Sequence, residues 1–234
     1  MLRAVVFDFN GVLVDDEPIH LEVFQRVLAD EGIALTAEEY YARWLGQDDR
    51  AVFAGVLEEN GQAVHPPRLM RLIARKAAWY QDRMRREGYP FFPGAADLVR
   101  AVADRGWVLA LVTGALRDEV EGALRQAGIL ECFKVLVTAE DVAEGKPDPA
   151  GYLEALEILN SQPPLPERLF HPHEVLAVED SPAGLTAAAA VGFATLALEH
   201  SYGRDRLAGA GVVVPSITGL TPERLEEIYA EAAG

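Results

Sequence analysis

Four short segments contain the side chains of this sequence that could carry out chemistry. Each stands at or after the end of a predicted strand, and together they hold aspartate, threonine, lysine and glutamate beside glycine or proline. Taken singly, the segments have ordinary structural explanations, because an aspartate can cap a turn and a Thr-Gly pair often begins a helix. Their combination in one chain is more specific. The segments are 8–15 (DFNGVLVD), 112–115 (VTGA), 145–149 (GKPDP) and 178–184 (VEDSPAG).

Together the segments provide the groups that phosphoryl transfer needs. Asp8 is a carboxylate that could attack phosphorus and form an aspartyl phosphate. Thr113, with the backbone N–H groups of Gly114 and Ala115 at a helix start, could hold phosphate oxygens. Lys146 could neutralise charge on the transferring group. These residue types therefore predict a phosphate site.

The acidic residues of the first and fourth segments also predict a metal. Asp8 and Asp180 are oxygen ligands of the kind that hard divalent cations prefer. Phosphoryl transfer commonly uses Mg²⁺ to neutralise developing charge. We therefore expect Mg²⁺ as the cofactor.

Apolar runs alternate with helical stretches over most of the chain, which predicts the elements that position these segments. Runs that are apolar on both faces suit strands buried between two helix layers. The alternation predicts an α/β fold with a doubly wound, Rossmann-like parallel sheet, whose ligands bind at the carboxyl ends of the strands. The predicted strands are 4–7, 107–112, 135–137, 175–178, 194–198 and 212–214, and the predicted helices between them are 95–104, 116–126, 149–159, 182–191 and 204–208.

A purely helical pattern interrupts this alternation after the first strand. The predicted helices there are 19–30, 37–44, 51–60 and 67–86. We interpret residues 16–90 as an inserted α-helical cap domain, with hinges near both ends. The core domain then consists of residues 1–15 and 91–234.

Composition excludes several classes of function. The chain has 21 Lys and Arg against 37 Asp and Glu, a net charge of −16. Such a surface repels phosphate backbones and anionic lipid, so we expect no nucleic-acid partner and no membrane. Cys132 has no second cysteine with which to form a disulfide, and no signal peptide pattern opens the sequence. We expect a cytoplasmic protein that is a monomer or a weak homodimer.

The order and spacing of the four segments resemble the haloacid dehalogenase superfamily of phosphohydrolases. The helical insertion resembles the cap of the subgroup that contains β-phosphoglucomutase and small phosphatases. The resemblance implies that Asp8 is the nucleophile, that Thr113 and Lys146 bind phosphate, and that Asp180 binds Mg²⁺. It also implies that Glu179 lies in the inner or outer shell of the metal, and that the backbone carbonyl of Asn10 completes the site.

Asn10 departs from the family pattern. Phosphatases of the family usually have a second aspartate two residues after the nucleophile, which protonates the leaving oxygen and then deprotonates water. An amide cannot shuttle a proton at neutral pH. Three explanations remain open. In the first, another group acts instead, and Asp15, Asp16, Glu17 and His20 are close in sequence. In the second, the natural leaving group needs no proton. In the third, the chain is an impaired or engineered form.

The cap is expected to select the substrate. His20, near the hinge, either faces the site or lies on a helix surface, and Arg50 either contacts a phosphate or carboxylate or is solvated. Leu45 stands where sugar-phosphate mutases of the subgroup tend to have a lysine, which disfavours mutase activity. We interpret the basic run 68–86, which includes Lys76, as one polar face of a helix.

These observations predict a Mg²⁺-dependent phosphatase that acts on a small phosphorylated metabolite, such as a sugar phosphate, through an aspartyl-phosphate intermediate. Two alternatives remain. One is a β-phosphoglucomutase-like phosphomutase, and the other is a catalytically impaired protein that binds a phosphorylated metabolite.

Overall fold

The computed structural model describes residues 1–232 and divides the chain into two compact units. The core unit consists of Met1–Asp15 and the residues from Pro90 onward, and the helical unit is Asp16–Tyr89. Pro90 was predicted to be the last residue of the helical insertion. It belongs to the core unit, where its carbonyl accepts a hydrogen bond from the Asp15 N–H at 2.8 Å.

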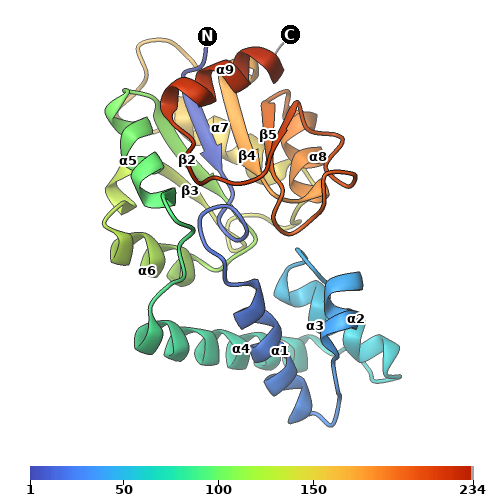
Figure 1. The fold of residues 1–234 in the computed structure, drawn as a ribbon. Coiled ribbons are helices and arrows are strands. Elements are labelled where there is room, and N and C mark those ends of the chain that lie inside the picture. The colour runs from blue at the N-terminus through green and yellow to red at the C-terminus, as the bar shows by residue number, and fades with distance from the viewer. Residues whose placement is uncertain (233–234) are drawn as a thin grey trace. The chain divides into compact units, whose positions relative to one another are not determined.

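The core unit is built on a parallel sheet (Figure 1). Its strands have the order β3-β2-β1-β4-β5-β6, and every pairing between neighbours is parallel. The predicted fold, a doubly wound parallel sheet, is confirmed. The strands are β1 (Ala4–Phe7), β2 (Val108–Val112), β3 (Phe133–Val137), β4 (Val175–Glu179), β5 (Ala194–Leu198) and β6 (Val212–Val214).

Helices cover both faces of this sheet, which explains why its strands are apolar throughout. On one face, α7 (Ala150–Ser161) and α8 (Pro182–Val191) bury side chains such as Tyr152 and Ala188 against Val6 and Ala177. On the other face, α5 (Ala95–Asp104) contacts β2, and α9 (Pro222–Ala232) contacts β5 and β6. The helix α6 (Arg117–Ala127) connects β2 to β3.

Two local predictions were wrong. Residues 204–208 form turns instead of a helix, and α9 was not predicted from the sequence. The helix α9 is amphipathic, with Leu225 and Ile228 buried. The buried residues of α9 span little more than one helical turn, and so short an apolar pattern is hard to recognise from the sequence alone.

The strand order changes direction between β1 and β4, which are neighbours in the sheet. From β1 the chain adds β2 and β3 on one side, and it then crosses to add β4, β5 and β6 on the other side. In open α/β sheets, ligands bind outside the carboxyl ends of the strands at such a switch point. Ala4 pairs with Val108 on one side and with Val175 on the other, so β1, β2 and β4 end at the same edge. The residues that follow these strands therefore lie close together.

The helical unit has a hydrophobic core of its own. Its helices are α1 (Glu17–Ala29), α2 (Ala37–Arg43), α3 (Asp49–Glu59) and α4 (Pro66–Glu87). Phe24, Phe53 and Leu72 are fully buried in this core. Thr36 and Glu39 form a capping box at α2, and Asp48 caps α3 by accepting from the Ala51 N–H at 2.8 Å. Within residues 1–232, no helix combines the length and apolar character that crossing a bilayer requires.

Candidate active site

Asp8 and the acidic pair Glu179 and Asp180 lie side by side at the switch point. Asp8 directly follows β1, and its backbone N–H donates to the carbonyl of Val178 in β4 at 2.9 Å. Glu179 is the last residue of β4, and Asp180 follows it. All three carboxylates are buried, and one oxygen of each lies within 4.8 Å of the others.

Lys146 is the cation of this cluster. It lies in the loop between β3 and α7, and its Nζ is 2.8 Å from Asp8 Oδ1 and 2.6 Å from Glu179 Oε1. The same ammonium donates to the carbonyl of Val112 at 2.9 Å. Three acceptors satisfy its three donor directions, so the side chain has a defined orientation. Burial by itself lowers the pKa of Lys146, but the charges of Asp8 and Glu179 raise it above its usual value.

Glu179 is held by several donors. Its Oε1 accepts from Lys146 and from the Tyr152 hydroxyl at 2.5 Å, while Oε2 accepts from the Ser181 hydroxyl at 3.2 Å. A Cβ atom at Gly184 would overlap this carboxylate, so glycine is required for α8 to approach it. Both oxygens of Glu179 therefore accept hydrogen bonds, and Oε1 contacts Lys146.

The cluster suits a hard divalent cation. Three buried carboxylates face one ammonium, which leaves excess negative charge. Burial raises the pKa of Asp8 to about 6, with Glu179 adding to the shift and Lys146 opposing it. Burial, with the charges of Asp8 and Glu179, also raises the pKa of Asp180 well above its ordinary value. Buried oxygen ligands with uncompensated charge are the donor set that Mg²⁺ or a similar cation requires.

Two more residues that sequence reasoning missed contact this cluster. The Ser201 hydroxyl donates to Asp180 Oδ2, and Tyr152 contacts Glu179 as described above. Ser201 follows β5, so the strand-end argument applied to β5 would have found it. Tyr152 offered no such signal, because a tyrosine in a helix is usually part of a core.

The loop after β1 turns sharply beside Asp180. Gly11 has a φ of 73°, and a Cβ at this position would overlap Asp180 Oδ2 and Ser201 Oγ. Glycine is therefore required on both counts. Asn10 precedes it, half-buried, and forms an isolated bridge with Val14.

Thr113 follows β2 at the same edge of the sheet and is buried. Its N–H donates to the carbonyl of Val137 at 3.0 Å, and its Oγ1 accepts from the Ala115 N–H at 3.0 Å. The Ala115 N–H, which was expected to face phosphate, therefore already donates a hydrogen bond within its own turn. Gly114 is exposed, and α6 begins two residues after Ala115, at Arg117.

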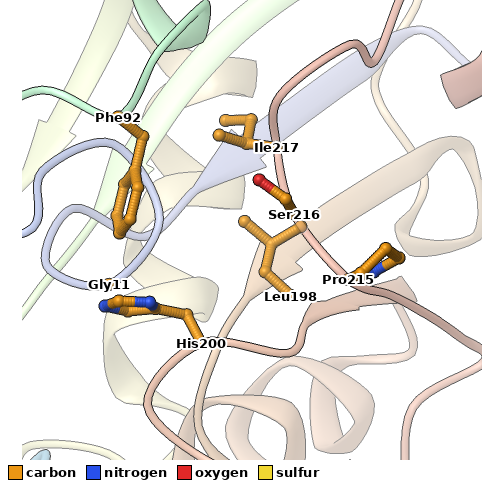
Figure 2. A pocket seen from close by; sticks show the side chains of 7 residues that line it. All are labelled: Gly11, Phe92, Leu198, His200, Pro215, Ser216 and Ile217. Carbon is orange, nitrogen blue, oxygen red and sulfur yellow. The ribbon is translucent and has the colours of Figure 1, made fainter.

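A small pocket adjoins Gly11 on the core unit (Figure 2). Phe92 and His200 form part of its wall, and their rings meet edge to face at a centroid distance of 4.6 Å. His200 Nε2 lies 3.2 Å from Asp15 Oδ1. The pocket lining consists of Gly11, Phe92, Leu198, His200, Pro215, Ser216 and Ile217.

The helical unit holds the remaining predicted site residues. His20 is buried, stacks on Tyr80, and lies 3.2 Å from Asp16 Oδ2 through Nε2 and 2.6 Å from Lys76 Nζ through Nδ1. The prediction that Lys76 lies on a polar helix face was wrong. Lys76 is only 2% exposed and donates to Asp49 Oδ1 at 2.6 Å. Arg50 is exposed in the first turn of α3, which starts before the predicted helix 51–60.

Comparison with known proteins identifies the family. A model of the haloacid dehalogenase-like hydrolases matches residues 2–192. The phosphorylated carbohydrates phosphatase of Thermotoga maritima is 30% identical over 86% of this chain and 85% of its own. Validoxylamine A 7′-phosphate phosphatase of Streptomyces hygroscopicus subsp. limoneus is 28% identical over 93% of this chain and 95% of its own.

A solved structure agrees with this assignment. An Asp-to-Asn mutant of CbbY from Rhodobacter sphaeroides, in complex with xylulose-(1,5)bisphosphate, has a TM-score of 0.82. It is 28% identical, and the alignment covers 94% of this chain and 96% of that one.

The chain belongs to the haloacid dehalogenase-like hydrolase family. It is an enzyme of the phosphatase type within that family, a phosphoric monoester hydrolase, and the prediction of this class is confirmed.

Proposed function

We propose that this protein is a Mg²⁺-dependent phosphatase that hydrolyses a small phosphorylated metabolite of the sugar-phosphate type. The observation that carries the proposal is the bridge that Lys146 forms between Asp8 and Glu179, beside Asp180, at the switch point of the sheet. In the proposed function, Asp8 is the nucleophile of this cluster, Lys146 its cation and Asp180 its metal-binding carboxylate.

Asp8 attacks phosphorus and carries the phosphoryl group as an aspartyl phosphate. Lys146, with its charge fixed by Glu179, stabilises negative charge on the transferring oxygens. Thr113 and the backbone of Gly114 and Ala115 bind the phosphate, which requires the Ala115 N–H to exchange its bond with Thr113 Oγ1 for one to the ligand.

The carboxylates of Asp8 and Asp180 and the backbone carbonyl of Asn10 would hold Mg²⁺, with Glu179 adjacent. When bound, the ion would neutralise charge on the phosphate oxygens. Ser201 orients Asp180 through its hydroxyl.

The substrate class rests on the relatives. Two of them are named as phosphatases of phosphorylated carbohydrates and of validoxylamine A 7′-phosphate, and a structural relative contains a sugar bisphosphate. We propose that the helical unit selects the substrate, with His20 and Arg50 as its contributing residues.

The test is phosphate release from a panel of sugar phosphates and other small esters, with Mg²⁺ and with EDTA. We expect Mg²⁺-dependent turnover of at least one ester, lost in Asp8→Asn and kept in Asp205→Asn, an exposed aspartate of the 204–208 turns. Unchanged turnover in Asp8→Asn would disprove the mechanism.

Asn10 supports a second candidate, a protein that binds a phosphorylated metabolite without hydrolysing it efficiently. That function predicts tight Mg²⁺-dependent binding with negligible phosphate release. Turnover above about 1 s⁻¹, the low end of usual enzyme rates, excludes it.

A further inference from the structure

Hydrolysis of an alkyl phosphate needs a group that moves a proton. The departing alcohol oxygen must be protonated, and the attacking water must then lose a proton, steps for which general acid–base catalysis supplies about 10²–10⁴-fold in rate. Asn10 cannot perform them, because its amide has no proton to exchange at neutral pH. Lys146 is held as a cation, and Asp8 and Glu179 have the other functions described above.

His200 is suitably placed for this task. Histidine is the side-chain type that exchanges protons most readily near neutral pH. The core unit contains three histidines, and two of them, His171 and His173, precede β4 and therefore lie at the amino edge of the sheet. His200 follows β5 and lies at the carboxyl edge, the edge of the candidate active site.

The His200 ring is oriented by its neighbours. Its Nε2 lies 3.2 Å from Asp15 Oδ1, and the imidazole ring packs edge to face with the Phe92 ring. A carboxylate that holds one ring nitrogen leaves the other free to exchange a proton, which is the arrangement of an imidazole base oriented by an acid. The side chain is 33% exposed, so water can reach it.

The segment that carries His200 is in contact with the carboxylate cluster. The next residue, Ser201, donates its hydroxyl to Asp180. Gly11, which follows Asn10, lines one pocket with His200 (Figure 2). A Cβ on Gly11 would overlap both Ser201 and Asp180. The imidazole and Gly11 therefore border the same pocket, and Gly11 is at the same time in close approach to Asp180.

We propose that the His200–Asp15 pair moves the protons of the reaction, a role that rests on the proposed phosphatase function. In the first step the Asp8 oxygen bonds to phosphorus, the bond from phosphorus to the alcohol oxygen breaks, and that oxygen takes the imidazolium proton. In the second step the neutral imidazole takes a proton from water. The water oxygen bonds to phosphorus as the Asp8–phosphorus bond breaks, which returns the carboxylate, inorganic phosphate and the imidazolium.

The test compares four proteins on one alkyl phosphate with saturating Mg²⁺: the natural chain, His200→Gln, Asn10→Asp, and the double variant. We expect His200→Gln to lower kcat by about 10²-fold in the natural chain, and by less than about 3-fold when Asn10→Asp supplies another proton-moving group. Asp15→Asn follows the same pattern with a smaller loss and provides a second variant if His200→Gln fails to fold. His173→Gln, an exposed histidine at the opposite edge, is the matched control and leaves kcat unchanged in both backgrounds.

A second readout separates proton transfer from a structural effect. p-Nitrophenyl phosphate has a leaving group that hardly needs protonation, so the loss in His200→Gln must be smaller on it than on the alkyl ester. Equal losses in both backgrounds, or no loss, overturn the proposal. If the natural chain is active and His200→Gln costs nothing, the role of His200 is wrong and the phosphatase function stands. If the natural chain is silent and Asn10→Asp is active, the role of His200 is wrong and the natural chain has the second candidate function, binding without efficient hydrolysis. If all four proteins are silent while each is folded, the proposed function itself fails.

Discussion

The Nζ atom of Lys146 lies 2.8 Å from Oδ1 of Asp8, although the two residues come from opposite sides of the insertion and from different strand ends. The second acceptor of the ammonium, Glu179, is fully buried. The charge of Lys146 therefore offsets two carboxylates that folding removes from water.

Replacement of this cation should be costly. Lys146→Gln leaves Asp8 and Glu179 without their ammonium, and breaking a buried ion pair typically costs about 3–5 kcal/mol. We expect a comparable loss in the free energy of unfolding at pH 7, measured by urea denaturation, and loss of turnover. The control Lys134→Gln removes a lysine that donates to the carbonyls of Leu159 and Pro164, and should cost less than about 1.5 kcal/mol. Equal costs for the two variants would contradict this account.

The Tyr152 hydroxyl should matter for catalysis through Glu179. Tyr152→Phe removes the bond to Glu179 Oε1, and a hydrogen bond to a charged group is worth about 1.5–3 kcal/mol. We expect kcat to fall several-fold with KM nearly unchanged, because the variant loosens Lys146 and not the substrate. Steady-state kinetics on the best ester of the panel measures this. Tyr41→Phe, an exposed tyrosine of α2, is the control, and a larger effect on KM than on kcat would argue against the explanation.

Gly184 should not tolerate a side chain. In Gly184→Ala the added Cβ would overlap the Glu179 carboxylate, so either the carboxylate or α8 must shift. We expect destabilisation by about 1–3 kcal/mol together with loss of activity. Gly209→Ala, where a Cβ meets no atom within 4 Å, should change stability by less than about 0.5 kcal/mol. Thermal and urea unfolding of the two variants provide the measurement. Unchanged stability and activity in Gly184→Ala would contradict the close approach of α8 to the Glu179 carboxylate.

Mg²⁺ should stabilise the protein through the carboxylate cluster. At a concentration 100 times the dissociation constant, one bound ion adds about 2.7 kcal/mol, which corresponds to a rise in Tm of about 5–10 °C for a chain of this size. Differential scanning calorimetry with and without Mg²⁺ tests this. Asp180→Asn should abolish the rise, whereas Asp205→Asn should keep it. A rise that persists in Asp180→Asn would place the ion elsewhere.

Glu174 should make stability depend on pH in the acid range. It directly precedes β4 and is 4% exposed. Although burial by itself raises its pKa, hydrogen bonds from the His171 N–H, Arg168 and Arg3 lower the pKa of Glu174 to about 2. Because the pKa is lower in the folded state, the stabilisation is complete above the ordinary value of 4.5 and disappears as pH falls from there toward 2.

The comparison of wild type with Glu174→Gln tests this dependence. We expect the variant to be less stable by about 1–3 kcal/mol at pH 7 and the difference to shrink below pH 4. Urea unfolding at pH 7, 5 and 3.5 gives the three values. Glu157→Gln, an exposed glutamate of α7, should be within about 0.5 kcal/mol of wild type at pH 7. A difference for Glu174→Gln that grows on acidification would have the wrong sign.

The fold class and the residue types of the candidate site could be predicted from local sequence patterns. Apolar runs alternating with helices specify a parallel sheet, and polar residues directly after a strand lie at its carboxyl edge whatever the details of packing. Asp8, Thr113, Glu179 and Asp180 could therefore be selected from local pattern alone.

The partners of these side chains could not be predicted in this way, because they depend on how the elements pack. Lys146 bridges two carboxylates, Tyr152 reaches Glu179 from a helix face, and the loop after β5 brings Ser201 to Asp180. In the helical unit, Lys76 is buried against Asp49 instead of exposed in a basic run. Such contacts depend on strand order and on the rotation of each helix against its neighbours. Periodicity within a single segment contains neither, because both are set by packing between residues far apart in the chain.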